Sequence, residues 1–520
     1  MQEKESGTLG PSLAGAAAIV AVGFLGSRVL GLLRSVVIAD AFGTGPDLGA
    51  YWVAFRLPDL IFQLLAGATL GAAFIPVFAR HFGQRGPAEA WRLASSVLNL
   101  VAVATIGFAV LGLILAPWLV PAMAPGLEER SLAVQLTRIM MVSPILFAVS
   151  GMLMGILNAR HHFLFPAIAP WFYNLSIIVA ALVSDDVHGL AVGVVVGALL
   201  HLATQLPALR AVGMSYSLVM GWRETAVREV GRLMAPRVLG LAAFQFNFLV
   251  TIFFASRVSD EAISAVNYGW LIMMTPLGLF GMAISTAVFP TLAEQASRDR
   301  GELRRTLAQS LRLILFLSIP ASVGLMILSE PLISFLFERG AFSAASTDIT
   351  EAVVLFYAIA VFAHSGIEIL SRGFYSLGDT RTPVLFAVVS LVTNLILCLI
   401  FVGPFGVRGL ALAMSLATIL EFVLLLWALD RRLEGLELDH LVYSVTRTVG
   451  ATILMAEVMG VLMVLLSAAG RLNTGDLVDS FLALAGGTIV GSAAFFLTAY
   501  LLRSEEAGAL LRRIPVLRPA

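Results

Sequence analysis

The first apolar run of the chain contains two arginines, and arginine is the side chain best suited to hold phosphate or carboxylate groups. Arg28 lies near the middle of this run, and Arg34 follows six residues later, about 9 Å further along a helix. An arginine at this depth in a bilayer costs several kcal/mol unless it faces protein or water. Six residues turn a helix so that the two side chains point about 120° apart, which suits the wall of a wide aqueous cavity.

A third arginine, Arg56, lies in the second apolar run, at a depth that residue counting makes similar to that of Arg34. Two guanidinium groups at one level in a water-filled cavity would bind a diphosphate through charge-assisted, bidentate hydrogen bonds. The alternatives are a structural ion pair with Asp40 or Asp59, or snorkelling to the outer surface. Pro58 predicts a break or kink in this helix, which frees backbone groups that only a protein- or water-lined cavity tolerates. Candidate supporting residues are Ser27, Ser35, Asp40, Asp59 and Gln63.

The other polar residues of the apolar runs are scattered, and most are interpreted as interhelical hydrogen bonders or protonated acids. His364 and Glu368, one helical turn apart, form a weaker candidate for proton coupling. The sequence contains no nucleophile constellation, phosphate-binding glycine loop or metal-ligand spacing. Cys398 is the only cysteine, so no intramolecular disulfide forms. These observations predict a protein that is not an enzyme and that has no cofactor or metal.

The composition is that of a membrane protein. Hydrophobic residues make up 59% of 520 positions and charged residues 13%, against roughly 45–50% and 25% in soluble domains. Formal charge is zero, so no global field attracts nucleic acid. About fourteen runs are long enough to span a bilayer as helices, which predicts an all-α polytopic fold. They are 13–42, 49–79, 93–117, 134–158, 164–183, 189–208, 233–256, 262–292, 308–328, 350–371, 383–402, 407–429, 446–467 and 479–502.

The loops predict the orientation. Arginines concentrate in the even-numbered connections, whereas the odd-numbered ones are poor in arginine or carry acids such as Asp185 and Asp186. Positive residues favour the cytoplasmic side. We therefore predict a multi-pass protein of the plasma (inner) membrane with both termini in the cytoplasm.

The chain also repeats weakly. Pro76 followed by Ala79 is similar to Pro290 followed by Ala293, and the pairs lie about 215 residues apart. Six helices per copy give both copies one orientation, as in transporters built from parallel repeats. The predicted organisation is an N-terminal tail, a first lobe, an amphipathic linker, a second lobe, an appended helix pair and a C-terminal tail, at 1–12, 13–220, 221–232, 233–430, 431–502 and 503–520.

Several motifs resemble the MurJ/MviN family of lipid II flippases, within the multidrug/oligosaccharidyl-lipid/polysaccharide exporter superfamily. The resemblance is densest in the segments 27–34, 41–43, 53–58, 73–76, 158–166 and 373–383. It implies fourteen helices and alternating access around a cationic central cavity, which moves undecaprenyl-diphosphate-linked peptidoglycan precursor to the outer leaflet. It also implies that Arg28 and Arg34 match functional arginines of the first helix. Implied partners are the lipid substrate, membrane lipids, and cell-wall synthesis and division proteins.

The sequence departs from the family pattern at several charged positions. Ser35 stands where the family usually has an acidic residue, and an arginine expected in the second helix falls near Phe62 and Gln63. In the eighth helix, the expected Asp-Arg pair and nearby Glu fall on Trp270, Leu271 and Met274. A cavity with fewer cations binds diphosphate more weakly or binds another ligand. Two alternatives therefore stay open: an exporter of another lipid-linked glycan or amphiphile, and a non-transporting scaffold for cell-wall synthesis.

Overall fold

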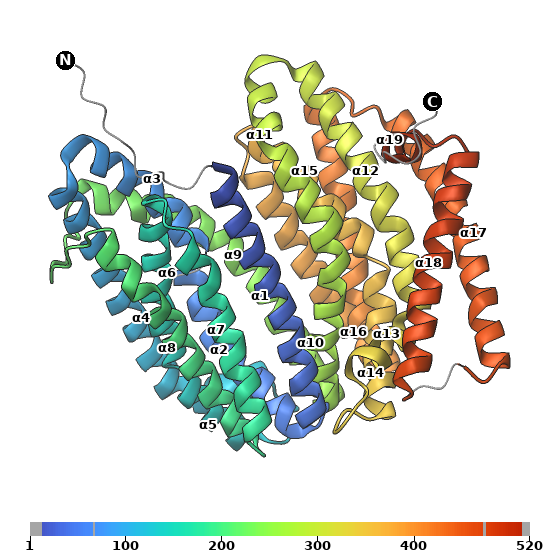
Figure 1. Ribbon diagram of the computed structural model, residues 1–520, viewed down its shortest axis with the longest axis horizontal. Coiled ribbons are helices and arrows are strands. Elements are labelled where there is room, and N and C mark those ends of the chain that lie inside the picture. Colours follow the sequence, from blue (N-terminus) through green and yellow to red (C-terminus); the bar gives the residue numbers. More distant parts are fainter. Residues whose placement is uncertain (1–12, 66–67, 472–474, 512–520) are drawn as a thin grey trace. The chain divides into compact units, whose positions relative to one another are not determined.

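The computed structural model describes residues 13–65, 68–471 and 475–511, and in this part of the chain the regular structure is entirely helical (Figure 1). The predicted all-α fold is confirmed. The described residues form two compact units. The first contains the chain up to Phe42 and Pro46–Gln245, and the second contains Gly43–Gly45 and the chain from Phe246 onward. The predicted N-terminal tail, 1–12, lies outside the described residues.

The first unit is built from eight helices and the beginning of a ninth. They are α1 Leu13–Phe42, α2 Pro46–Leu65, α3 Ala68–Arg85, α4 Pro87–Met123, α5 Arg130–Met140, α6 Ser143–Ala159, α7 Leu164–Val183, α8 Val187–Ala211 and the first part of α9 Thr225–Val258. Its core joins α3, α4 and α6 through buried aromatic and aliphatic side chains, among them Phe74, Phe78 and Trp91.

The second unit contains the remaining helices and a short π-helical turn. They are α10 Asp260–Pro276, the π-turn Leu277–Met282, α11 Ala283–Arg298, α12 Arg300–Ile327, α13 Ser329–Phe337, α14 Ala344–Ala358, α15 Val361–Ser376, α16 Arg381–Arg432, α17 Leu438–Ala468, α18 Leu477–Leu501 and α19 Glu505–Leu511. Local sequence sets several of their starts. At α12, for example, the Asp299 carboxylate accepts hydrogen bonds from the N–H groups of Gly301 and Glu302.

Ten helical segments of the described chain are long and apolar enough to cross a membrane, or eleven if the pair α14 and α15, bent by 46°, forms one span. Each of the fourteen predicted runs lies on a helix or a helix pair. Two of these runs merge in α16, where Gly406 takes a φ of 56° and turns the chain between them. The protein is therefore a multi-pass membrane protein.

One local prediction was wrong. Pro58 was expected to break or kink the second helix, but α2 continues as a helix through Pro58 to Leu65. The proline ring removes one backbone donor, but Pro58 and its neighbour Leu57 are buried. The helix therefore continues through a buried turn that lacks one backbone hydrogen bond.

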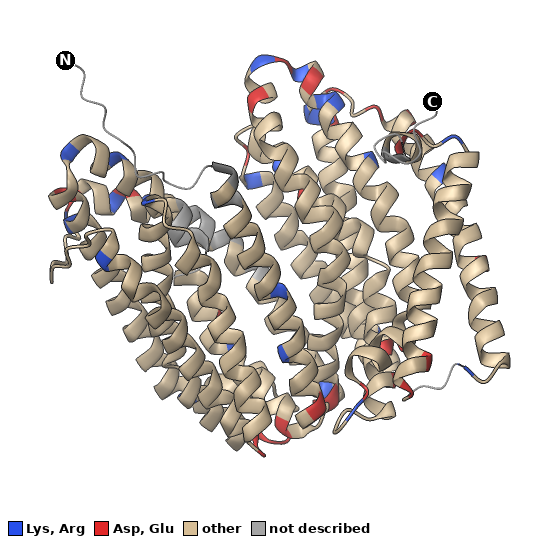
Figure 2. Ribbon diagram, in the orientation of Figure 1, with Lys and Arg blue, Asp and Glu red and all other residues tan. Residues whose placement is uncertain are grey.

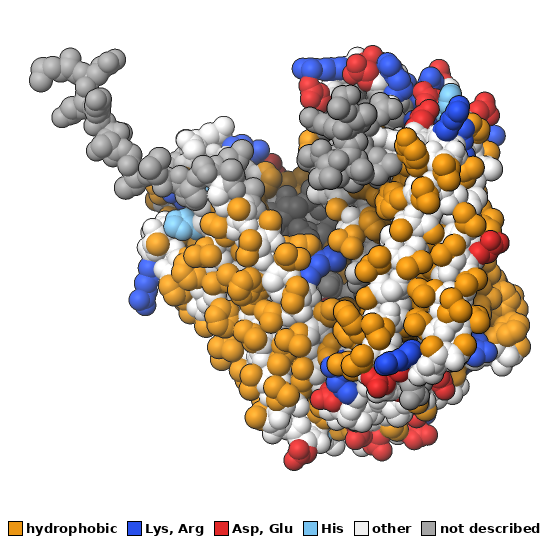
Figure 3. All heavy atoms as spheres, turned by 45° about the vertical axis from the view of Figure 1, so that its right-hand side comes forward, with side chains coloured by type: hydrophobic (Ala, Val, Ile, Leu, Met, Phe, Trp, Pro, Cys, Tyr) orange, Lys and Arg blue, Asp and Glu red, His pale blue; other side chains and the backbone are white. Residues whose placement is uncertain are grey.

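Charge and apolar surface are separated along the helices. Basic and acidic residues gather near the helix ends, and long stretches between them are free of charge, although α1 carries basic residues within its length (Figure 2). On the face drawn in Figure 3, hydrophobic side chains cover the flanks of the helices and charged side chains lie mainly beyond them. This pattern is typical of a surface that contacts lipid.

Helix α1 is held against α7 by small residues. The Trp171 indole donates a hydrogen bond of 2.8 Å to the Gly23 carbonyl. A Cβ at Gly26 would lie 2.4 Å from the same indole ring, and one at Gly23 would lie 2.5 Å from the Ala167 side chain. Close approach of two helices through glycines is a common device in membranes, and here it fixes the helix that carries Arg28 and Arg34.

We predict that Gly26→Ala destabilises the protein, because the added methyl group overlaps Trp171 and overpacking costs about 1–3 kcal/mol. The measurement is the thermal unfolding midpoint in detergent. Gly107→Ala on α4 is the matched control, since nothing lies within 4 Å of a Cβ at that position. An equal midpoint for both variants would show that α1 does not depend on this contact.

Candidate functional site

The two arginines of α1 have no acidic partner among the described residues. Arg28 is exposed, and its guanidinium lies 4.9 Å from the centre of the Phe24 ring. Arg34 is partly buried and lies 5.9 Å from the centre of the Tyr173 ring on α7. Both therefore rest on aromatic faces, which attract cations without neutralising them. The ion pair with Asp40, which the sequence left open, does not form.

Arg56 on α2 is in a different situation, because its charge acts on the nearby Asp59 carboxylate. The two Asp59 oxygens also accept hydrogen bonds of 3.5 Å each, one from Gln63 and one from Gln245. The predicted supporting role of Gln63 thus has a geometric basis, since it orients Asp59. Of the alternatives that the sequence left open, an acidic neighbour is present at Arg56, where it is Asp59, and no ion pair is formed by Arg34 among the described residues.

Aromatic residues connect these charged groups within the first unit. The charges of Arg34 and Asp59 both act on the Tyr173 hydroxyl, and Arg34 also acts on the buried Tyr51 of α2. The Phe147 ring packs edge-to-face on Tyr173 at 5.0 Å. The structure therefore brings Arg34 and the pair Arg56 and Asp59 to one neighbourhood. The sequence analysis did not select Tyr51 or Tyr173.

The supporting serines face their own or the adjacent helix. The Ser35 side chain is buried, and its hydroxyl donates to the Gly31 carbonyl at 3.1 Å. The Ser27 carbonyl accepts a hydrogen bond of 3.5 Å from the amide of Asn174 on α7. The Ser35 bond lies within α1, whereas the Ser27 carbonyl joins α1 to α7, and neither bond involves a guanidinium.

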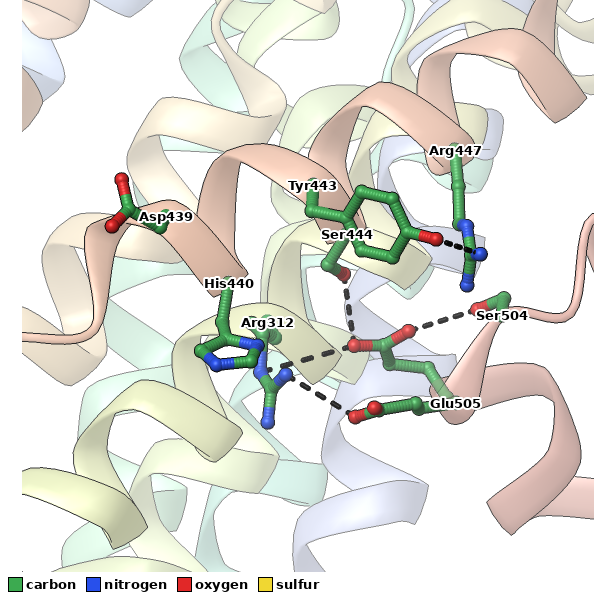
Figure 4. Close-up of a pocket in the computed structure, with 9 residues that line it drawn as sticks. Arg312, Asp439, His440, Tyr443, Ser444, Arg447, Ser504 and Glu505 are labelled. Carbon is green, nitrogen blue, oxygen red and sulfur yellow. Dashed lines mark hydrogen bonds and ion pairs between the residues drawn. The ribbon is translucent and has the colours of Figure 1, made fainter.

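Other arginine clusters of the protein are neutralised locally. A cavity of about 600 Å³ in the first unit contains the ion pairs Arg80–Glu229, Arg85–Glu89 and Arg92–Glu224. A cavity of about 320 Å³ in the second unit is lined by α12, α17 and α19. There Arg312 pairs with Glu505 at 3.3 Å and lies 4.0 Å from Glu506 (Figure 4). Except for Arg85–Glu89, these pairs join segments that are distant in sequence. Arg28 and Arg34 differ from them because they lie within the length of an apolar helix and have no acidic partner among the described residues.

The proton-coupling candidates lie on α15 in the second unit. The His364 Nε2 lies 3.3 Å from the Thr418 hydroxyl, and the His364 ring packs edge-to-face on Trp270 at 5.9 Å. Glu368 forms an ion pair of 3.2 Å with Arg372, which also donates to the Thr286 hydroxyl at 2.9 Å. His364 therefore has a polar partner on α16, and Glu368 has one on α15.

Comparison with known proteins identifies the family. The family model described as lipid II flippase MurJ matches residues 38–482. A probable lipid II flippase MurJ of Rhizobium tropici is 30% identical over 516 residues, with 95% of each chain covered. A probable lipid II flippase MurJ of Vibrio cholerae is 32% identical over 449 residues, which cover 82% of this chain and 83% of the relative. The chain belongs to the MurJ family.

Solved structures agree with this assignment at the level of the fold. The lipid II flippase MurJ in an inward closed conformation matches 93% of this chain and 98% of its own with a TM-score of 0.78 at 23% identity. An inward-facing multidrug resistance transporter of the MATE family matches 81% of this chain and 99% of its own with a TM-score of 0.67 at 14% identity. The expected exporter fold is confirmed.

Trp270, which the sequence analysis marked as a departure from the expected charge pattern, lies among aromatic rings of the second unit. It packs edge-to-face on Phe248 at 4.8 Å and on Tyr357 at 6.3 Å. Its neighbour Tyr268 is buried and contacts Phe337 and Phe342. Aromatic contacts therefore surround position 270.

We predict that Arg28→Cys reacts with a membrane-impermeant thiol reagent and that Ser35→Cys does not. Arg28 is exposed and its role requires water, whereas Ser35 is 4% exposed. The native Cys398 is buried and should stay silent. Labelling is measured on the protein in lipid nanodiscs, with unfolded protein as the reference for full reaction. Protection of position 28 would place it against acyl chains and contradict a hydrated site.

Proposed function

We propose that this protein is a lipid II flippase, which moves the undecaprenyl-diphosphate-linked peptidoglycan precursor from the inner to the outer leaflet. The observation that carries the proposal is the match to the MurJ family over residues 38–482 together with two arginines of α1 that have no acidic partner among the described residues. A diphosphate is a ligand that such guanidinium groups bind strongly. The arginine-rich loops support a plasma-membrane location with both termini in the cytoplasm.

The three arginines differ in their contacts, and we infer a different role for each. Arg28 and Arg34 rest on aromatic rings and are available for a phosphate oxygen. Asp59 competes with substrate for Arg56, because an opposite charge lies beside that guanidinium. We infer that Arg34 is the principal contact, that Arg28 guides the head group along α1, and that Arg56 contributes once the head group displaces Asp59.

Transport follows by alternating access, in which the two helical units expose the head-group site to one side of the membrane and then to the other. The lipid tail stays in the bilayer, so the main barrier is transfer of a charged head group. One charge that crosses the membrane potential gains about 2.3 kcal/mol per 100 mV. An inside-negative potential therefore favours outward movement of an anion, and the potential alone is a sufficient driving force.

Two alternatives have their own support. Trp270, Leu271 and Met274 remove charges expected in the family pattern, which favours an exporter of another lipid-linked glycan or amphiphile. A scaffold that recruits cell-wall synthesis or division proteins would need no arginine in α1. Mass spectrometry of lipid that co-purifies with the protein separates the two substrates, and rescue of a flippase-depleted strain separates a transporter from a scaffold.

We predict that Arg34→Ala abolishes rescue of a strain depleted of its lipid II flippase, because the variant loses the bidentate contact to the diphosphate. Arg34→Lys should rescue in part, since lysine keeps the charge but not the planar fork. Arg298→Ala is the control, because Arg298 pairs with Glu294 on an exposed surface. Membrane levels of all variants are compared by immunoblot. Full rescue by Arg34→Ala at normal levels would exclude the proposed role.

We further propose that His364 and Glu368 contribute proton coupling, because they lie one turn apart within an apolar helix with polar partners on α16 and α15. In proteoliposomes, Glu368→Gln should lose stimulation of flipping by a pH gradient and keep stimulation by a potential. Glu457→Gln on the exposed face of α17 is the matched control. A pH response in Glu368→Gln equal to that of the control would rule out this coupling and leave the flippase proposal intact.

A further inference from the structure

The connection between α8 and α9 contains an extended segment, residues 214–220, whose side chains alternate between two faces. Together with the turn residues Gly221 and Trp222 we call it the strap. Its outward side chains are Tyr216, Leu218, Met220 and Trp222, which are 53%, 92%, 43% and 57% exposed. The intervening residues are partly buried. Leu218, Met220 and Trp222 thus project from one face of a segment that is neither helix nor sheet, whereas the exposed Tyr216 ring returns to α4 through its hydroxyl.

The outward face is fixed, because the inward face is hydrogen-bonded to α4. The Asn99 amide donates to the carbonyls of Ser217 and Val219 at 3.1 and 2.9 Å. The Tyr216 hydroxyl donates to the Asn99 carbonyl oxygen at 2.7 Å, and the Ser217 N–H donates to the Ser95 hydroxyl at 3.1 Å. Ser95 and Asn99 are one helical turn apart, so the strap follows the surface of α4.

The end of the strap is fixed as well. Gly221 takes a φ of +45°, and a Cβ there would lie 2.4 Å from the Ser96 hydroxyl, so only glycine fits this turn. Beyond it, Glu224 accepts from Arg92 at 3.1 Å. The Arg223 guanidinium lies 4.6 Å from the centre of the Trp222 ring. The exposed face therefore ends in a stacked tryptophan and arginine.

The strap extends an apolar surface that α4 already presents. Large exposed apolar residues on α4 begin at Val103, one turn beyond Asn99, and continue to Trp118. The strap is bonded to Asn99, which lies one helical turn, about 6 Å, before Val103 and thus toward the arginine-rich end of α4. In water, full exposure of Leu218 would forgo about 1.5–3 kcal/mol of burial energy. Tryptophan, tyrosine and arginine are the residues enriched where acyl chains meet head groups.

We propose that the strap is a membrane anchor, with Leu218 and Trp222 inserted at the acyl boundary of the leaflet beside it and Arg223 among the lipid phosphates. Lipid is favoured over a bound protein strand for a specific reason. A strand that pairs with the strap needs a regular row of extended backbone groups, but the Val219 N–H donates back to the Ser217 carbonyl at 2.9 Å, and Asn99 binds the carbonyls of Ser217 and Val219, so the row is interrupted. The anchor leads directly into α9, which begins in the first unit and ends in the second.

The test measures the depth of position 218. A spin label is attached at Leu218→Cys in a Cys398→Ser background, which removes the single native cysteine. The labelled full-length protein is placed in nanodiscs of phosphatidylethanolamine and phosphatidylglycerol. Collisions with oxygen, which concentrates in lipid, are compared with collisions with a water-soluble nickel chelate. Labels at Leu111 on the apolar surface of α4 and at Gln84 on the exposed end of α3 serve as the lipid and water references.

We expect the ratio of oxygen to nickel collisions at position 218 to exceed that at Gln84 by at least fivefold and to approach that at Leu111. A label at Val219, which faces α4, should be shielded from both reagents. A ratio at 218 equal to that at Gln84 would show that the strap lies in water and would overturn the anchor. Shielding of 218 from both reagents would overturn it too, because protein would then cover the face. Neither result depends on the transported substrate.

Discussion

A guanidinium group inside an apolar helix needs water, an anion or an acidic neighbour, and Arg28 and Arg34 of α1 are in this situation. The exposed Arg80 and Arg92 and the more buried Arg312 form ion pairs with glutamates, which join α3 to α9, α4 to the residue before α9, and α12 to α19. Arg28 and Arg34 contact aromatic rings instead. Aromatic rings leave the charge available, since attraction by a ring is worth about 0.5–2 kcal/mol and does not replace a phosphate. The proposed substrate role rests on these two uncompensated charges within one apolar helix.

The glycine contacts between α1 and α7 hold in place the helix that carries Arg28 and Arg34. A long side chain at Gly23 or Gly26 would separate the helices, and Arg34 would lose its contact with Tyr173. The charges of Arg34 and Asp59 both act on the Tyr173 hydroxyl, so the two groups lie in one neighbourhood. Preorganisation of this kind lowers the entropy lost when a flexible head group binds. The first unit thus holds its cations in a defined geometry before substrate arrives.

The sequence was sufficient for most of the fold, because long helices depend on composition and on counting along the chain. The apolar runs predicted the long helices, and the division between the runs 383–402 and 407–429 coincides with the turn at Gly406. The runs missed the short helices α13 and α19, whose sequences are too short to stand out as spans. A break at Pro58 was expected, but α2 continues as a helix through this residue. Tyr51 and Tyr173 escaped notice because a tyrosine in an apolar run is ordinary, and only tertiary contact brings it to an arginine.

The departures from the family pattern bear on how a substrate leaves. A transporter must bind its ligand tightly enough to select it and weakly enough to release it, and each charge-assisted hydrogen bond is worth roughly 1.5–3 kcal/mol. Trp270 fills its position with aromatic packing, and Asp59 moderates Arg56. If the proposed site binds a diphosphate, each contact that these features remove corresponds to about tenfold or greater in the dissociation constant. Faster release is the consequence, because differences in affinity within one kind of site fall mainly on the dissociation rate. A reduced set of cations is therefore compatible with a flippase that turns over a scarce, strongly anionic lipid, since tight binding without release would stop transport.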